Sequence, residues 1–312
     1  MRNPGTELQY WPDIAFFCRK AHIAFWAIAL SLLSVSCSAV SQFAGSKVTL
    51  WKVRGDHNVL YLLGSVHVLS QKCYPLKPAL DRAFEDSRRV VFEIDLNRFT
   101  SASFRQEFRK TALYPPGQSL SKKISPETAE LLKQVLPVYG LTLGRVEHLR
   151  PWFIAEWLSS RTLEMAGFSE SLGVDIYFFR KARATGKPVL GLETLRDQAQ
   201  IFDRFSDEEN ERYLVRTLAT LATYPLAINR LVSAWQNGNV DMLDEILNRD
   251  KHSDPVTHKA LFSERNTKWL PEIEALAHKD ENYLIIVGAG HLVGEDGVIA
   301  QLKRVGYSVE QM

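Results

Sequence analysis

The sequence predicts an α/β fold with a mixed central β-sheet, helices on both faces and a helical cap formed by long insertions. Short, nearly uniform apolar runs alternate along the chain with stretches of helical pattern. Apolar runs of this kind are typical of strands that are buried on both faces of a sheet. Two of the helical stretches are much longer than a simple connection between strands, so we expect them to form a cap over one end of the sheet.

The chain begins its globular pattern with a predicted β-hairpin. Apolar runs at residues 48–53 and 59–63 flank the turn-forming segment Arg54-Gly55-Asp56-His57-Asn58, and such a segment between two apolar runs favours a hairpin. A helix is expected at residues 77–87, beginning near two prolines. A third strand is expected at residues 89–96.

The remaining elements follow from proline and glycine breaks. Residues 101–185 are expected to be mostly helical, with breaks at Pro115, Pro116, Pro137, Pro151 and Gly167. A fourth strand is expected at residues 188–192, followed by a second helical stretch at 195–278. The chain should close with a very apolar strand at 282–288, a helix at 296–305 and a strand at 307–310.

Composition limits the class of protein. The 312 residues are 46% apolar and 24% charged, which is typical of a globular protein and excludes disorder or a coiled coil for the whole chain. The net charge of +2 gives no reason to expect a nucleic-acid partner. Cys73 is the one cysteine outside the first 46 residues, so neither a disulfide framework nor a cysteine-based zinc site is expected.

The first 46 residues are predicted to be a targeting segment. Basic residues precede an uncharged apolar run at 23–40, and small residues follow it. This is the layout of a signal peptide, although the run is also close to the shortest length that crosses a membrane, so an N-terminal membrane anchor is the alternative. Cys37 leaves a lipoprotein as a third outcome, but Ser34 stands where leucine is usual. We therefore expect residues 47–312 to form an exported domain, periplasmic or membrane-anchored and facing outside the cytoplasm.

Four of the predicted strands end in a histidine or a carboxylate. His67, Glu93, Glu193 and His291 follow or close these apolar runs. In an α/β sheet, the ligand crevice lies at the carboxyl ends of the strands. If the four strands run in the same direction, the four side chains should meet in one crevice.

Both histidines belong to a Gly-x-x-His motif, formed by Gly64 with His67 and by Gly288 with His291. Glycine lets the backbone turn off a strand and lets a ligand come close to it. Two histidines and a carboxylate are enough to hold zinc, manganese or cobalt with a position open for water. A histidine here is also a candidate general base.

Structural roles are the alternative for each of these residues. A histidine after a strand is often an ordinary loop residue, and Glu93 could be a buried ion-pair partner instead of a functional group. Glu193 could instead cap the helix that is expected to begin near residue 194. Arg265 is a solvated helical charge by default, and an inward partner of Glu93 or Glu193 in the sharper hypothesis. Neither a Gly-x-Ser-x-Gly nor a His-Glu-x-x-His motif is present.

These motifs resemble the TraB/GumN family, which includes the Tiki metalloproteases. The resemblance runs from Trp51 nearly to the C-terminus. It rests on six short segments in order: Leu62-Leu63-Gly64-Ser65-Val66-His67, Phe92-Glu93, Leu172-Gly173-Val174-Asp175, Leu190-Gly191-Leu192-Glu193, Glu264-Arg265-Asn266 and Val287-Gly288-Ala289-Gly290-His291-Leu292. It implies an active site of two Gly-x-x-His motifs and a glutamate. For the Tiki branch it implies peptide cleavage that depends on a divalent metal, with manganese or cobalt favoured; the wider superfamily is similar to erythromycin esterase-like hydrolases, where a histidine can act without metal.

We therefore expect an exported metal-dependent hydrolase, a peptidase before other kinds, with a peptide or protein substrate. His67 and His291 would ligate the metal, and Glu93 would ligate it or act as a general base. Glu193 and Arg265 would not bind the metal but would hold these groups in position. Two alternatives remain open: a non-catalytic exported protein that sequesters a peptide or signal in the same crevice, and a metal-free esterase-like hydrolase with His67 as the base.

Overall fold

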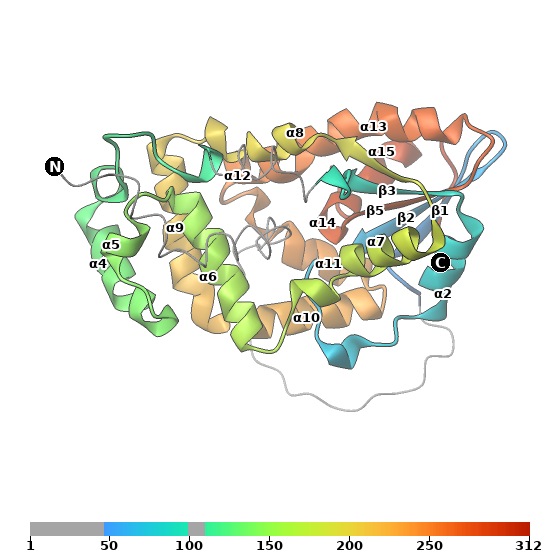
Figure 1. Ribbon diagram of the computed structural model, residues 1–312. Helices are drawn as coiled ribbons and strands as arrows, with labels where there is room; N and C mark the ends of the chain where they lie inside the picture. The colour runs from blue at the N-terminus through green and yellow to red at the C-terminus, as the bar shows by residue number, and fades with distance from the viewer. Residues whose placement is uncertain (1–46, 99–109) are drawn as a thin grey trace.

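The computed structural model describes residues 47–98 and 110–312, and a six-stranded sheet lies at one side of the molecule (Figure 1). The order of the strands in the sheet is β4-β3-β5-β2-β1-β6. Their bounds are β1 Leu50–Arg54, β2 Val59–Ser65, β3 Arg89–Ile94, β4 Val189–Glu193, β5 Tyr283–Gly288 and β6 Val309–Gln311. The predicted targeting segment at residues 1–46 lies outside the described residues, as does the start of the helical stretch expected at 101–185.

The sheet is mixed, as predicted. β2 pairs in parallel with β5, and β3 pairs in parallel with both β5 and β4. β1 is antiparallel to both of its neighbours, β2 and β6, and the predicted hairpin of β1 and β2 is confirmed. The four strands that were predicted to end in functional side chains therefore run in the same direction, and their carboxyl ends lie at one edge of the sheet.

Helices cover both faces of this sheet, and neighbouring residues of β3 show it. Successive side chains of a strand point to opposite faces. Phe92 packs edge-on against Phe179, with ring centroids 6.2 Å apart, while the next residue, Glu93, reaches Arg265 on the other face. The helices that carry these partners therefore lie on opposite faces (Figure 1). The helices beside the sheet are α2 Pro78–Asp86, α7 Val174–Thr185, α13 Glu264–Ala277, α14 Ala289–Leu292 and α15 Val298–Arg304.

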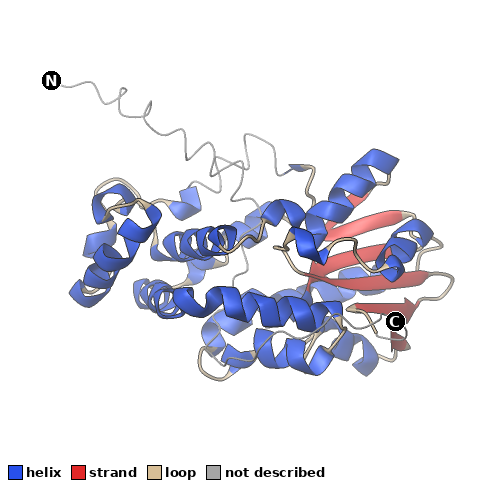
Figure 2. Cartoon of the chain, turned by 90° about the horizontal axis from the view of Figure 1, so that it is seen from below, coloured by secondary structure: helices blue, strands red, loops and turns tan. Residues whose placement is uncertain are grey.

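The two long insertions form the predicted helical cap, which lies beyond the carboxyl ends of the parallel strands (Figure 2). It has apolar clusters of its own, in one of which Leu120, Leu132 and Leu214 are fully buried. In another, Trp152 stacks on Phe202 with ring centroids 4.6 Å apart. The helices of the insertions are α4 Pro126–Val135, α5 Leu143–Val146, α6 Pro151–Met165, α8 Leu195–Ala199, α9 Asp207–Thr220, α10 Tyr224–Gln236, α11 Val240–Leu247 and α12 Pro255–His258.

β4 differs from the expectation of a strand buried on both faces. Its residues are mostly half-buried or exposed, and Leu190 is 37% exposed. The reason is its position, because β4 is an edge strand that pairs with β3 alone in the described part of the chain. An apolar run predicts a strand, but the run itself does not distinguish a central strand from an edge strand.

Val48 is joined by hydrogen bonds to the C-terminal end of the chain. Its backbone N–H donates to the carbonyl of Met312 at 2.7 Å, and its carbonyl accepts from the side chain of Gln311 at 3.0 Å. None of the helices within residues 47–98 and 110–312 is long and apolar enough to cross a membrane.

A chain that begins at Gly45 is therefore expected to fold. Its free energy of unfolding should lie within about 1 kcal/mol of the full-length value, because it keeps every contact that the structure describes among residues 47–98 and 110–312. Chemical denaturation of both chains measures the difference. A chain that begins at Arg54 is the control: it lacks most of β1, which joins β2 to β6, and should not fold. Insolubility of the Gly45 chain beside a soluble full-length protein would contradict the prediction.

Candidate active site

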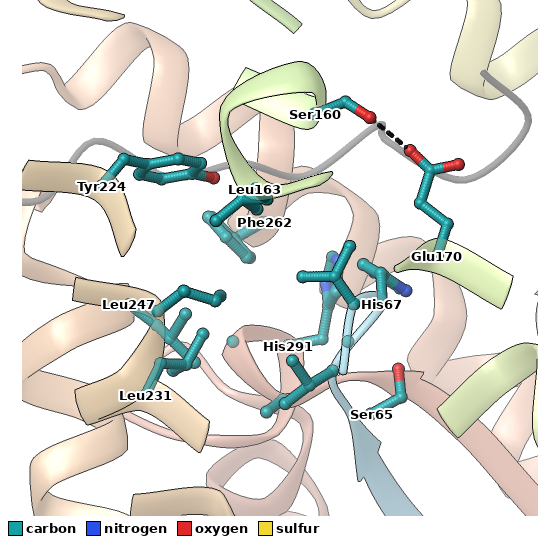
Figure 3. A pocket seen from close by; sticks show the side chains of 16 residues that line it. Ser65, His67, Ser160, Leu163, Glu170, Tyr224, Leu231, Leu247, Phe262 and His291 are labelled. Atoms are coloured by element: carbon teal, nitrogen blue, oxygen red, sulfur yellow. Dashed lines mark hydrogen bonds between the residues drawn. The ribbon is translucent and has the colours of Figure 1, made fainter. Parts of the chain in front are cut away.

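The side chains predicted from the strand ends do meet at one edge of the sheet. His67 lies two residues beyond β2, and Glu93 is the penultimate residue of β3. Glu193 ends β4, and His291 lies in α14, directly after β5. His67 and His291 both line a pocket at this edge (Figure 3).

Arg265 joins three of these side chains. It is 4% exposed, and its five N–H groups all find acceptors. Nε and Nη2 bind the carboxylate of Glu193 at 3.1 and 2.6 Å, and Nη2 also binds Glu93 Oε2 at 2.6 Å. Nη1 donates to the carbonyl of Leu261 at 3.0 Å and to His291 Nε2 at 2.7 Å. An inward arginine that meets Glu93 or Glu193 was one of the two hypotheses for Arg265, and it meets both.

The carbonyl of Leu261 that Arg265 binds lies in a local departure from the α-helix. Lys259–Ser263 forms a π-helix between α12 and α13. π-Helical turns are rare and are often found at functional sites. This turn also places the ring of Phe262 against His291, with centroids 5.0 Å apart. No pattern in the sequence predicted it.

The two glutamates differ in what they reach. Glu93 Oε2 accepts from Arg265 and from Gln198 Nε2 at 3.2 Å, while Oε1 accepts from the backbone N–H of Gly288 at 2.8 Å. Glu193 accepts from Arg265 and from Trp269 Nε1 at 3.1 Å. Glu193 does not cap the helix that follows, because Thr194 does so in a capping box with Asp197. Glu93 therefore reaches Gly288, which lines the pocket, while Glu193 is held by Arg265 and Trp269.

His291 is neutral. It is 1% exposed, and burial together with the positive charge of Arg265 holds its pKa well below the usual range. Because a guanidinium only donates, His291 Nε2 must accept from Arg265. The proton is therefore on Nδ1, which donates to Asn266 Oδ1 at 2.6 Å. Both ring nitrogens of this predicted metal ligand are engaged by protein.

His67 has a different environment. Its Nδ1 lies 2.7 Å from Asp175 Oδ2. Burial lowers the pKa of His67, but the negative charge and hydrogen bond of Asp175 outweigh it and raise the pKa to about 9. The positive charge of His67 in turn lowers the pKa of Asp175 against the effect of burial. His67 Nε2 is buried and has no hydrogen-bond partner among the described residues.

Asp175 is the functional candidate that reasoning from residues did not single out, although it stands in one of the segments of the family resemblance. It lies in the first turn of α7. The backbone there comes very close to the Gly-x-x-His segment: a Cβ on Gly173 would lie 2.2 Å from the carbonyl oxygen of His67, and Val174 N donates to the carbonyl of Val66 at 3.0 Å. The available signal was a glycine two residues before an aspartate, but nothing local connects it to His67.

The two motif glycines allow close approach in different ways. A Cβ on Gly64 would lie 2.7 Å from Thr49 Cγ2 and 3.1 Å from Ala289 Cα, so Gly64 lets β2 pack against its neighbours. A Cβ on Gly288 would lie 3.3 Å from Glu93 Oε1 and 3.4 Å from His67 Nε2. Gly288, which lines the pocket with His67, therefore leaves space between His67 Nε2 and Glu93 Oε1.

The family resemblance implies a bound divalent metal, so the side chains of the site should include suitable ligands for one. Within residues 47–98 and 110–312, no three His, Cys, Asp or Glu side chains are grouped closely enough to form a ready metal site. However, His67 Nε2 has no partner among the described residues. The space that Gly288 leaves by having no side chain lies between this nitrogen and Glu93 Oε1. Imidazole and carboxylate are also ligands that manganese, cobalt and zinc accept. In kind and in placement, these two residues fit a divalent ion.

The chain is similar to an uncharacterized bacterial protein and to animal proteins named as metalloproteases. The chain is 25% identical over 271 residues to the uncharacterized protein YbaP of Escherichia coli, covering 82% of this chain and 97% of that protein. It is 23% identical over 314 residues to metalloprotease TIKI1 of Danio rerio, covering 84% of this chain and 62% of the relative. It is 22% identical over 358 residues to metalloprotease TIKI2 of Xenopus tropicalis, covering 96% of this chain and 67% of the relative. No solved structure matches the chain significantly.

The family assignment covers nearly the whole described domain. A model of the TraB/PrgY/gumN family matches residues 49–311, a range that includes all six strands and the whole site. The segments of the sequence that carried the resemblance lie within this range. The chain belongs to the TraB/PrgY/gumN family.

Proposed function

We propose that the chain is an exported hydrolase of peptide bonds, with a divalent metal ion bound at His67 and Glu93. The observation that carries the proposal is the buried His67 Nε2, which faces the pocket without a partner among the described residues while Asp175 holds the opposite ring nitrogen. Relatives named as metalloproteases support peptide cleavage. The layout of residues 1–46 supports export.

The roles of the side chains follow from their contacts. Asp175 fixes the ring of His67 so that Nε2 faces the pocket, as carboxylates behind metal-binding histidines commonly do. Glu93 Oε1 would be the second ligand, and Arg265 and Gln198 hold its other oxygen in place. A bound divalent ion supplies hydroxide at neutral pH by lowering the pKa of a water molecule. His291, the third predicted ligand, could join only by giving up its hydrogen bond to Arg265.

A second candidate is a metal-free hydrolase, and the same contact between Arg265 and His291 favours it. With His291 engaged by protein, two side chains remain to hold a metal, whereas catalytic zinc sites usually have three protein ligands. His67 and Asp175 form the pair that a general base uses: one nitrogen held by a carboxylate and one directed at the substrate. Because the pKa of His67 is raised to about 9, this base would be fully available only at alkaline pH.

Metal binding separates the two candidates. The purified domain is expected to bind about one divalent ion, and His67→Ala should abolish this binding. Asp175→Asn should weaken it by roughly ten- to a hundredfold, because the ligand remains but its orientation is less well fixed. Elemental analysis and calorimetric titration with Mn²⁺ measure both effects.

His278→Ala is the matched control, since His278 is an exposed histidine paired with Asp56 far from the pocket. It should leave Mn²⁺ binding unchanged. Equal binding by wild type and His67→Ala would rule out the metal site. Activity that persists in a metal-free wild type would then favour the metal-free hydrolase, and ligand binding without any product would favour a protein that only sequesters a peptide.

A further inference from the structure

The pocket beside His67 has an apolar wall that the hydrolytic groups do not use (Figure 3). We propose that this wall receives a bulky apolar side chain of the peptide substrate, next to the bond that is cleaved. This inference rests on the proposed hydrolase function. It adds the class of substrate that the site selects, and it assigns the selection to residues of the helical cap.

The wall is built from elements of the cap. Tyr224, Ile228 and Leu231 stand four and three residues apart on α10, so they share one face of that helix, and all three line the pocket. The other apolar side chains of the wall are Leu163, Leu247 and Phe262. The cap helices α6, α10 and α11 thus present their apolar faces to the catalytic end of the sheet.

These side chains are buried by their own packing and still border empty space. Leu163 is 3% exposed, Phe262 5% and Leu247 8%. The cavity has a volume of about 60 Å³ and is partly open to solvent, so it is a small recess that is still larger than the space one water molecule needs. An apolar group of the substrate that enters this space leaves water without displacing a hydrogen-bonding partner of the wall.

The polar lining of the pocket is segregated from the wall. His67, His291 and Ser65 lie at the end of the sheet, and Ser160 and Glu170 lie together at the pocket's other side (Figure 3). Ser160 Oγ donates to Glu170 Oε1 at 2.7 Å. A peptide with its scissile carbonyl at His67 can therefore place a neighbouring side chain against the wall.

Charge adds a second part to the selection. Glu170 contributes a carboxylate to the lining, and Glu93 and Asp175 contribute two more behind it. An acidic side chain on the substrate would meet like charge at short range and would lose its hydration on entry. The pocket should therefore favour leucine, isoleucine or phenylalanine and exclude aspartate and glutamate.

The test uses a peptide library in which one residue next to the cleaved bond varies. Wild type should cleave peptides with leucine or phenylalanine at least tenfold better in kcat/KM than those with glycine or alanine. Leu231→Trp fills the pocket and should reduce this ratio to less than about threefold, mainly through KM. Leu231→Ala enlarges the pocket and should shift the preference toward tryptophan, which also covers the case in which Leu231→Trp does not fold.

Leu226→Trp is the matched control, because Leu226 lies on the same helix, is 56% exposed and does not line the pocket. It should keep the wild-type preference. Cleavage by wild type without any preference for apolar residues would overturn the inference, as would an unchanged profile in both Leu231 variants.

Failure of the hydrolase proposal itself gives a different result. Binding of N-acetyl-leucinamide, measured by NMR titration, needs no turnover. If no peptide is cleaved but the compound binds to wild type and to Leu226→Trp and not to Leu231→Trp, the hydrolase function is wrong and the apolar subsite stands. If N-acetyl-leucinamide does not bind and N-acetyl-aspartamide does, the assignment of the wall is wrong. Absence of both cleavage and binding overturns both proposals.

Discussion

Replacing Arg265 by methionine is expected to lower the free energy of unfolding by about 3–5 kcal/mol, because it leaves buried carboxylates without their cation. Glu93 and Glu193 both bind Nη2 of Arg265 at 2.6 Å, and the three side chains are less than a tenth exposed. Methionine has a similar length but no donor. The variant also removes the hydrogen bond to His291 Nε2 and the stacking of the guanidinium on Trp269, 4.6 Å from the ring centroid.

The measurement is chemical denaturation of the variant beside a matched surface change. Arg161 binds Glu164 at 2.7 Å on an exposed stretch of α6, and Arg161→Met should cost less than about 1 kcal/mol. Adding Glu193→Gln to Arg265→Met should recover part of the loss, because it removes one uncompensated negative charge from the interior. Equal stability of Arg265→Met and Arg161→Met would show that the buried network contributes nothing net.

The fold was largely predictable because its signals are local. Each predicted strand is an apolar run bounded by turn residues, and the order of strands and helices limits the fold to a few classes. The approach of His67, Glu93, Glu193 and His291 followed from one further step: polar side chains at the ends of strands gather at one edge when those strands are parallel. The prediction assumed that these strands run in the same direction, and their parallel pairing in the sheet shows that they do.

Local sequence patterns could not predict which residues bind each other within the site. Asp175 reaches His67 across 108 positions, and Arg265 reaches Glu93 across 172. Such pairs depend on how α7 and α13 pack on opposite faces of the sheet, and no spacing in the sequence encodes that distance. The π-helix at Lys259–Ser263 is similar, because the extra residue in the turn is fixed by the contacts of Phe262 and Arg265 after folding.

Glu93 makes contacts that fit both of its predicted roles, the structural ion-pair partner and the functional carboxylate. One carboxylate oxygen, Oε2, binds Arg265 and Gln198, as a structural ion-pair partner would. The other, Oε1, accepts from Gly288 N and lies beside the space in front of His67. The same side chain is thus part of the buried network and borders the space between Gly288 and His67.

Glu93→Gln is therefore expected to change both activity and stability. Turnover of the best library peptide should fall by roughly a hundredfold or more, because the charge that would hold a metal or activate water is lost. Stability should fall by about 1–3 kcal/mol, the usual cost of an unsatisfied buried polar group. Gly288 N, Arg265 Nη2 and Gln198 Nε2 all donate to Glu93, but glutamine has a single acceptor oxygen, so its amide must turn its own N–H groups toward a donor.

Glu193→Gln separates the two effects. Glu193 accepts from Arg265 and Trp269, so its replacement should cause a similar loss of stability through the same network. Neither glutamate lines the pocket, but Glu93 alone of the two binds Gly288 N and borders the space beside His67. The effect of Glu193→Gln on kcat should therefore stay below about tenfold, the lower end of what a supporting residue behind the site contributes. Parallel measurement of kcat and denaturation midpoint on the two variants decides the role of Glu93. If Glu93→Gln loses stability as Glu193→Gln does and keeps comparable turnover, Glu93 belongs to the buried network alone, and His67 with Asp175 must carry the chemistry without it.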